Sequence, residues 1–315
     1  MPPTLPPPPR DDPGRPPDGP VPTDPPRAAV VDAVRRALAE DLLPMGDLTA
    51  SLVPASLVRT VAVVSRAEGV VAGRACAVEA FREIDPTLEV RWQLDDGSRV
   101  APGDRVAVVS GSLRSILTAE RTVLNFLCHL SGVATLTRRF VDAVVAVDPA
   151  VRVLDTRKTT PGLRSLEKAA VRAGGGTNHR GSLSEAVLVK DNHLGGVTIA
   201  DAVATARRLW PGRMVEVECD RPDQVAEATE AGATVVMLDN MTPDQVVACV
   251  TIVRRGGSAT LVEVSGGVTL ETAPALAAAG VDLLSVGALT HSAPALDLGL
   301  DLVAAGGGAP DDVED

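Results

Sequence analysis

Basic residues gather in one short stretch of an otherwise acidic chain. Between Arg157 and Lys190 there are seven cations and only two acids, whereas the whole chain of 315 residues has a formal net charge of −11. A surface with that overall charge repels nucleic acid and anionic lipid, so a small anionic ligand needs a local cluster of cations. The stretch therefore predicts a focused anion site.

The seven cations fall into two groups. Three are spaced as on one face of a helix, where exposure to water is at least as good an interpretation as ligand binding. They are Arg164, Lys168 and Arg172. The other four flank predicted strand ends or a glycine-rich loop, and we expect these to bind the anion. They are Arg157, Lys158, Arg180 and Lys190.

Two carboxylates, Glu218 and Asp239, end successive predicted strands. Ribose hydroxyls or a magnesium ion carried by a pyrophosphate would suit both, since a buried carboxylate needs a partner and Mg²⁺ prefers oxygen ligands. The alternative is a structural salt bridge to a neighbouring lysine. Glycine loops at 265–267 and 285–292 follow the last two strands, where backbone N–H groups commonly bind phosphate.

The histidines and cysteines add one candidate donor. His179 lies beside Arg180 in the loop GGGTNHR and could donate to a carboxylate. His193 and His291 also follow strand ends, although either could equally be a simple loop histidine. His129 is expected in the core or at an interface. The four cysteines form no CxxC pair, so neither a zinc site nor a disulfide framework is predicted.

Six short β-branched runs after Ala150, each followed by an alanine-rich segment, must position these groups. They are VRVLD, EAVLVKD, MVEVE, TVVMLD, TLVEVS and LLSVG. A full eight-unit barrel needs about 250 residues, so the pattern predicts an α/β fold with an incomplete parallel barrel of six to seven strands. The loops after barrel strands open on one face, which would bring the strand-end residues together.

Upstream of the barrel the pattern differs. Residues 1–26 hold 13 of the 25 prolines and are predicted to be a disordered tail. A helix is predicted from Ala28 to just before Pro44. Alternating runs over 60–111 predict a small antiparallel sheet. A helical stretch over 115–145 contains Gly132, which could divide it. No apolar run is long enough to cross a bilayer and no signal pattern is present, so a cytoplasmic protein is expected.

Seven longer motifs occur in order along the chain: AERTVLNFLCHLSGVAT, LDTRKTTPGLRSLEKAAVRAGGGTNHR, VLVKDNH, VEVECD, VMLDN, EVSGG and SVGALTHS. With these motifs, the chain closely resembles the quinolinate phosphoribosyltransferase family from Ala28 to Val303. The resemblance implies an N-terminal open α/β sandwich over 27–132 and an incomplete barrel of the type II phosphoribosyltransferase kind over 133–290. Residues 291–307 would pack back on the first domain, and 308–315 would form a disordered tail.

The resemblance also implies an activity. The enzyme would transfer a phosphoribosyl group from phosphoribosyl pyrophosphate to quinolinate with decarboxylation, giving nicotinate mononucleotide, pyrophosphate and CO₂ for NAD biosynthesis. Mg²⁺ would accompany phosphoribosyl pyrophosphate, without an organic cofactor. A homodimer, or a higher oligomer, would place Arg121 of one subunit in the site of its partner.

By motif, the resemblance assigns residues to each substrate. Quinolinate would contact Arg121, Thr156, Arg157, Lys158, His179, Arg180 and Lys190. Phosphoribosyl pyrophosphate would contact Lys158, Glu218, Asp239, Asn240, Ser265, Gly266, Gly267, Val286, Gly287, Ala288 and His291. Lys158, Glu218 and Asp239 would serve catalysis, and the two acids would meet the substrate-bound Mg²⁺.

The chain departs from the usual family pattern in two places. Relatives usually read NHRMGLYD and LEKYAV, where this chain has NHRGSLSE over 178–185 and LEKAAV with Ala169. Neither change removes a charged binding residue, but both bear on loop packing. Three other functions remain as alternatives: a phosphoribosyltransferase-like paralogue associated with molybdenum transport, a Schiff-base aldolase using Lys158 or Lys190, and a non-catalytic anion-binding protein.

Overall fold

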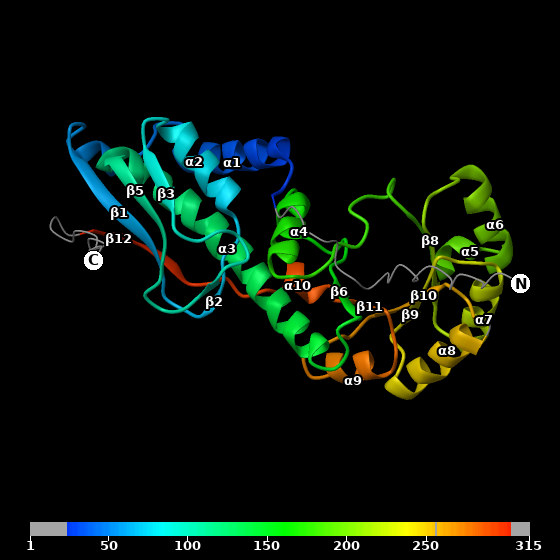
Figure 1. Cartoon of the computed structure of the whole chain (residues 1–315). Coiled ribbons are helices and arrows are strands. Elements are labelled where there is room, and N and C mark those ends of the chain that lie inside the picture. The colour runs from blue at the N-terminus through cyan, green and yellow to red at the C-terminus, as the bar shows by residue number, and fades with distance from the viewer. Residues whose placement is uncertain (1–23, 256, 304–315) are drawn as a thin grey trace, which may run out of the picture.

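The computed structural model describes residues 24–255 and 257–303, which form two halves joined by one long helix (Figure 1). That helix, α3 (Leu113–Val145), has 33 residues and is therefore about 50 Å long. The predicted tails lie outside the described residues, except for positions 24–26. Within the described part of the chain, no helix has both the length and the apolar character needed to cross a membrane.

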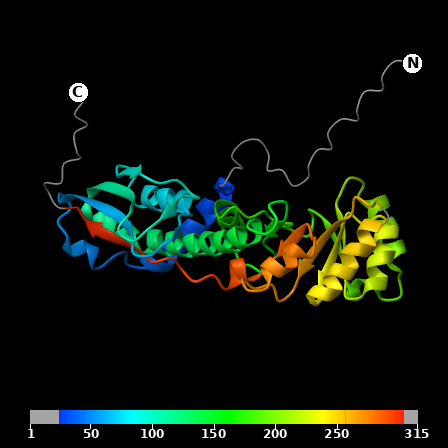
Figure 2. The ribbon, with the colours of Figure 1, turned by 60° about the horizontal axis from the view of Figure 1, so that its bottom comes forward.

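The N-terminal half is built on an antiparallel sheet. Its strands, in spatial order, are β12 (Leu298–Leu302), β1 (Val58–Ser65), β5 (Arg105–Ser112) and β3 (Glu89–Trp92). The last described strand of the chain therefore returns to the first sheet (Figure 2). Smaller elements complete this half: α2 (Arg74–Ile84), η1 (Ala50–Leu52), and the pair β2 (Gly69–Val70) and β4 (Arg99–Val100).

The first helix shows why the sequence periodicity was informative. α1 (Arg27–Leu42) begins one residue before the predicted start at Ala28 and ends before Pro44, as the pattern predicted. Its buried residues include Val30, Val34 and Leu38, which are four residues apart and so lie on one face. This face packs on the neighbouring helices, and charged residues cover the opposite face.

The expectation that Gly132 could divide the long helix was wrong, because α3 continues through it. A Cβ atom at Gly132 would lie 2.2 Å from the carbonyl oxygen of Pro294 and 3.0 Å from the Cα of Ala295. The glycine therefore serves a close crossing of the C-terminal segment over the helix. Local sequence cannot reveal this contact, because the two segments are far apart in the chain.

The C-terminal half is an open parallel barrel, which confirms the predicted fold class. Its strands, in spatial order, are β6 (Arg152–Leu154), β11 (Leu283–Ser285), β10 (Leu261–Ser265), β9 (Val235–Asp239), β8 (Val215–Cys219) and β7 (Val187–Val189). In the described residues β6 and β7 do not pair with each other, so the sheet stays open between them. The helices are α4 (Arg164–Ala173), α5 (Asp191–Leu194), α6 (Ile199–Leu209), α7 (Pro222–Glu230), α8 (Pro243–Arg255), α9 (Ala273–Ala278) and α10 (Ala288–His291).

Candidate active site

The carboxyl ends of the barrel strands surround a cavity of about 610 Å³. Parallel strands end on the same side of the sheet, which is why residues from separate motifs meet there. Twelve of the predicted site residues line this cavity: Thr156, Arg157, Lys158, His179, Arg180, Lys190, Glu218, Asp239, Asn240, Ser265, Gly266 and Gly267.

Four further predicted residues lie at the rim, after β11. Val286 is buried and donates its N–H to the carbonyl of Leu154, and Ala288 begins α10. A Cβ atom at Gly287 would lie 3.1 Å from Nε2 of His291 and 3.3 Å from Cδ of Lys158. The last glycine loop is therefore in direct contact with Lys158.

Arg121 is the predicted residue that the single chain does not bring to the cavity. It lies on α3 in the N-terminal half, with its side chain exposed. Among the described residues, none forms a hydrogen bond or an ion pair with its guanidinium. In the described part of the chain, therefore, neither Glu120 nor another local acid holds Arg121 in a salt bridge.

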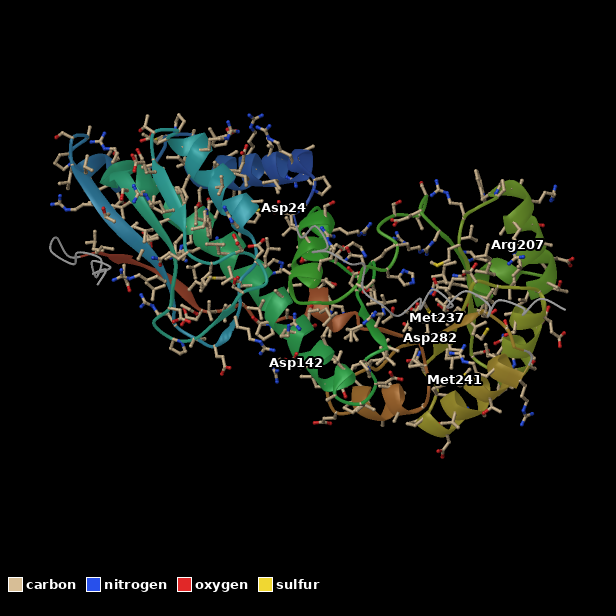
Figure 3. The ribbon with its side chains drawn as sticks, in the orientation of Figure 1. Asp24, Asp142, Arg207, Met237, Met241 and Asp282 are labelled. Atoms are coloured by element: carbon tan, nitrogen blue, oxygen red, sulfur yellow. The ribbon has the colours of Figure 1, made fainter. Side chains whose placement is uncertain are left out.

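The sequence analysis did not identify several side chains that lie deeper in the barrel than the predicted site residues. Leu188, Met237 and Ser285 also line the cavity, and Met237 is labelled within the barrel in Figure 3. Below them, Glu216 and Glu263 are fully buried. Each acid precedes a cavity residue by two positions in a strand, so the alternation of side chains along strands was the signal that could have found them.

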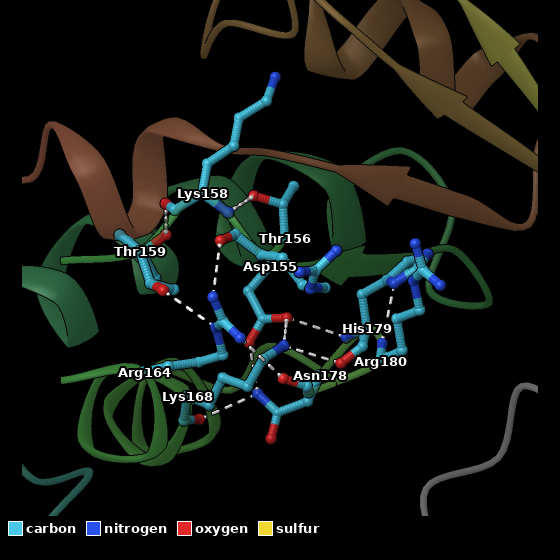
Figure 4. A network of polar contacts seen from close by, with 12 residues as sticks. Asp155, Thr156, Lys158, Thr159, Arg164, Lys168, Asn178, His179 and Arg180 are labelled. Atoms are coloured by element: carbon cyan, nitrogen blue, oxygen red, sulfur yellow. Dashed lines mark hydrogen bonds and ion pairs between the residues drawn. The ribbon is translucent and has the colours of Figure 1, made fainter. Parts of the chain in front are cut away.

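A buried ionic network holds the loop that carries His179 and Arg180 (Figure 4). The Lys168 ammonium donates to the Asp155 carboxylate and, at 2.7 Å, to the carbonyl of His179. Asp155 also accepts from Nδ2 of Asn178 at 2.6 Å and from the backbone N–H of His179 at 2.9 Å. Burial raises the pKa of Asp155 and lowers that of Lys168, while the opposite charge of each partner counteracts the shift of the other. The network fixes the loop against the end of β6.

The interpretation of the three cations at helical spacing as a water-facing set was wrong. Lys168 is only 6% exposed. The guanidinium of Arg164 donates to Oγ1 of Thr159 at 3.1 Å and to the carbonyl of Gly181 at 3.2 Å. Arg172 donates to Oδ1 of Asn178 at 2.6 Å. All three support the loops around the cavity, because α4 packs directly beneath them.

Arg157, Lys158 and Arg180 line the cavity without an ion pair to any acid of the described residues. Burial, with the charge of Arg157 as the second cause, lowers the pKa of Arg180. Nε of Arg157 is buried and has no hydrogen-bond partner in the described chain. Lys158 is exposed, and in Figure 4 its side chain extends away from the network below it. Like charges held this close predict an anion between them.

The acidic side of the cavity combines carboxylates with a glycine turn. Glu218 forms an ion pair with Lys190, which is the lysine partner that the sequence offered as an alternative. Asp239 pairs in register with Ser265 and accepts from Nδ2 of Asn240 at 2.8 Å. Gly266 has a φ of +84°, a left-handed conformation that favours glycine, and a Cβ atom there would lie 2.2 Å from Oδ1 of Asn240.

The side chain of His179 points into the protein. Its Nδ1 accepts the backbone N–H of Arg180 at 2.8 Å, and its Nε2 lies 3.0 Å from Oε2 of Glu216 and 3.6 Å from Oε2 of Glu263. Burial would lower the pKa of His179, but the contact with Glu216 and the charges of both acids outweigh it and raise the pKa. Burial, assisted by the charge of Glu216, raises the pKa of Glu263 to about 8.

The remaining histidines have local partners. Nδ1 of His193 accepts the backbone N–H of Lys190 at 3.1 Å, and Nδ1 of His291 lies 2.6 Å from Oγ of Ser292. Nε2 of His129 lies 2.9 Å from the buried Glu167, but the His129 side chain is itself 32% exposed and so lies at the edge of the core. In the divergent segment 178–185, Glu185 accepts the N–H of Gly181 at 2.7 Å and so closes the loop.

The cavity therefore has two chemically distinct sides. Cations from the loops after β6 and β7 and from the segment between α4 and β7 form one side. Carboxylates and glycine turns at the ends of β8, β9, β10 and β11 form the other. Lys158 adjoins both, because it follows Arg157 in sequence and touches the loop at Gly287. This arrangement can hold two anions next to each other, one of them carrying hydroxyl groups.

Comparison with known proteins agrees with this chemistry. The family models described as quinolinate phosphoribosyl transferase, N-terminal domain and C-terminal domain, match residues 47–131 and 133–301. A carboxylating nicotinate-nucleotide pyrophosphorylase of Mycobacterium leprae is 42% identical over 278 residues, which cover 87% of this chain and 97% of that protein. A probable enzyme of the same name from Bacillus subtilis is 40% identical over 264 residues, covering 82% and 88%. The solved structure of the nicotinate-nucleotide pyrophosphorylase from Francisella tularensis matches with a TM-score of 0.85 at 39% identity, covering 89% and 98%.

Proposed function

We propose that this chain, which belongs to the quinolinate phosphoribosyltransferase family, transfers a phosphoribosyl group to quinolinate with loss of pyrophosphate and CO₂. The product is nicotinate mononucleotide, a precursor of NAD. The observation that carries the proposal is the two-sided cavity, because its cations match a dicarboxylate and its acids and glycine turns match a phosphorylated ribose.

Quinolinate binds on the cationic side. Its two carboxylates meet Arg157, Arg180 and Lys190, with Thr156 at the same strand end. Lys158 lies between the two substrates, where its ammonium also stabilises the charge of the departing pyrophosphate. Binding the dianion here holds the ring nitrogen toward the ribose, which replaces a bimolecular encounter by a fixed geometry.

Phosphoribosyl pyrophosphate binds on the other side. Glu218 and Asp239 accept from the ribose hydroxyls, and backbone N–H groups of the loops at 265–267 and 286–288 bind the phosphates, with Asn240 and His291 beside them. The ion pair between Lys190 and Glu218 separates when the substrates enter. Lys190 then faces a carboxylate of quinolinate, and Glu218 faces the ribose hydroxyls.

The reaction needs no protein nucleophile. The ring nitrogen forms a bond to C1 of the ribose while the bond from C1 to pyrophosphate breaks. The ribosylated nitrogen is positively charged and stabilises the electron pair left on C2 when its carboxylate departs as CO₂, after which C2 takes up a proton. The residues of the chain supply position and charge stabilisation.

A magnesium ion carried by the pyrophosphate fits the acidic side. Glu218 and Asp239 offer hard oxygen donors at adjacent strand ends, and Asp239 has no cationic partner among the described residues. When bound, Mg²⁺ would neutralise part of the pyrophosphate charge. No organic cofactor is required by these steps.

We further propose a homodimer in which Arg121 completes the partner's quinolinate site. Three observations support it. Arg121 is exposed without a partner in the described chain, and one turn before it on α3 the apolar Leu117 is 37% exposed. Apolar side chains that are more exposed than Leu117 lie in the segments before α3, and a two-fold contact would bury them. They are Leu43, Met45, Leu48, Leu52 and Val58.

We place this activity in the cytoplasm. The four cysteines are free thiols, and three of them are buried, which suits a reducing compartment. Fractionation of the source cells with antibody detection would check the location.

The direct test is an assay with quinolinate, phosphoribosyl pyrophosphate and Mg²⁺, with nicotinate as a competing substrate. Nicotinate mononucleotide, pyrophosphate and CO₂ should form from quinolinate. Nicotinate should not be used, because one missing carboxylate leaves cations unpaired in the cavity. Equal turnover of nicotinate would overturn the proposed specificity, and tight quinolinate binding without turnover would indicate a binding protein. Borohydride trapping of a carbonyl substrate would reveal an aldolase instead.

A further inference from the structure

Two buried acids face one histidine beneath the cavity. Glu216 on β8 and Glu263 on β10 have 0% and 1% of their surface exposed, and the side chain of His179 has 8%. Both carboxylate oxygens of Glu216 and Oε1 of Glu263 lack a hydrogen-bond partner in the described structure. Nε2 of His179 is 3.0 Å from Glu216, although the angle is poor for a hydrogen bond. Unpaired carboxylates this deeply buried are costly, so the cluster needs a function to explain it.

The hydrogen on the His179 ring can be located from its partners. Nδ1 accepts the backbone N–H of Arg180 at 2.8 Å, so Nδ1 carries no hydrogen. The neutral ring must then carry its hydrogen on Nε2, which faces the two acids. The ligand atoms of all three residues lie within 4.8 Å of one another, close enough for a metal ion. A ring nitrogen that carries a hydrogen cannot bind a metal, however, so the contacts favour an N–H group held between carboxylates.

We propose that Glu216 and Glu263 are positioning residues, which hold the Nε2–H of His179 and thereby keep Nδ1 bound to the backbone N–H of Arg180. The inference rests on the proposed phosphoribosyl transfer and assigns a further layer to its quinolinate site. His179 acts through Arg180 in this arrangement, because both of its ring nitrogens already contact protein groups. The loop is thus held from two sides, by the network of Asp155 and Lys168 on its backbone and by the two acids on its imidazole.

Nitrogen-15 NMR spectroscopy tests the contact between His179 and the two buried acids independently of enzyme activity. The chain has only four histidines, so His179 can be assigned by comparing labelled wild-type protein with His179→Gln. At a pH above the raised pKa of His179, the wild type should show a neutral ring with hydrogen on Nε2 and a bare Nδ1. The double variant Glu216→Gln with Glu263→Gln should lose this fixed tautomer. A wild-type ring with hydrogen on Nδ1, or a Nε2 signal that shifts on adding Zn²⁺, would overturn the proposal.

Kinetics then separate positioning from a general structural role. In the double variant the KM for quinolinate should rise on the order of tenfold or more, because Arg180 is no longer fixed, while the KM for phosphoribosyl pyrophosphate stays within about twofold. Glu167→Gln is the matched control, since Glu167 is also a fully buried acid beside a histidine, His129. It should lower the melting temperature without changing the His179 signals or the KM for quinolinate.

The outcomes distinguish this inference from the proposed function. If wild-type protein fails to convert quinolinate while the His179 tautomer is as expected, the proposed function fails and the contact stands. If conversion is normal but the double variant changes both KM values equally, the positioning role is wrong. Should the double variant not fold, Glu216→Gln and Glu263→Gln are measured singly, and an unchanged His179 spectrum in both would count against the inference.

Discussion

The two halves of the molecule use charge in opposite ways. In the barrel, the Asp155 and Lys168 pair is buried, and the cavity is lined by more cations than acids. In the N-terminal half, ion pairs such as Arg35 with Glu83 at 3.1 Å lie at the surface. Such exposed pairs contribute at most about 1 kcal/mol each.

Arg121 is the exception in the N-terminal half, because it is exposed and unpaired among the described residues. The barrel has a surplus of cations facing a cavity, and the helix presents one more cation outward. We infer from this difference that a residue of the site need not be buried within its own chain. A site can draw its buried support from one subunit and an exposed charge from the other.

The largest effect is expected from the cation between the two substrates. Lys158→Ala should lower kcat/KM on the order of a thousandfold, because we propose that the ammonium contacts both the dianion and the leaving group. Steady-state kinetics with both substrates would measure this. Arg35→Ala is the control from the N-terminal half, since it breaks an exposed ion pair. A loss for Lys158→Ala no greater than that of Arg35→Ala would remove the contrast between the halves.

Breaking the buried pair should chiefly affect stability. Lys168→Met leaves the Asp155 carboxylate buried without its cation, which typically costs about 3–5 kcal/mol. Urea unfolding of Lys168→Met and of the double variant with Asp155→Asn would measure it. The double variant should lose less than the sum of the single changes. A loss below about 1 kcal/mol would mean that the pair behaves like a surface pair.

A smaller and more selective effect is expected at the acidic side. Glu218→Ala or Asp239→Ala should weaken phosphoribosyl pyrophosphate binding on the order of tenfold, since each carboxylate is assigned to ribose hydroxyls and Mg²⁺. Quinolinate binding should change less. Calorimetric titration of each ligand in turn would decide, and an unchanged response to phosphoribosyl pyrophosphate would reject the assignment.

The smallest effect is expected from the proline-rich start of the chain. Deleting residues 2–23 should leave kcat/KM unchanged and the free energy of unfolding within about 0.5 kcal/mol, because this segment offers almost no apolar side chain to bury. The deletion spares Asp24, whose carbonyl accepts from Arg172 at 3.1 Å. A marked loss of stability would show that the segment has a docking place.

Much of the barrel was predictable because its signals are local. Each strand is a short β-branched run, and the polar residue that ends it, such as Glu218 or Asp239, lies at the cavity. Parallel strands bring these ends together whatever the loops between them do. The same logic, extended by two residues along the strand, would have predicted the buried Glu216 and Glu263.

Contacts between distant segments could not be predicted. Gly132 reads as a helix breaker until Pro294 is placed over it, and Lys168 reads as a surface residue until Asp155 is placed beneath it. Helical spacing shows which residues share a face. It does not show whether water or another part of the fold covers that face.

The central claim, that the site is shared between two subunits, is tested most directly by mixing two inactive variants. Arg121→Ala and Lys158→Ala, each refolded alone, should be nearly inactive, because each removes a charge partner of the bound dianion. Unfolded and refolded together, they should recover about a quarter of the wild-type activity, since half of the dimers are mixed and each mixed dimer has one complete site. If mixed dimers form, as tagged pull-down would show, and the mixture stays inactive, Arg121 does not act in its partner's site.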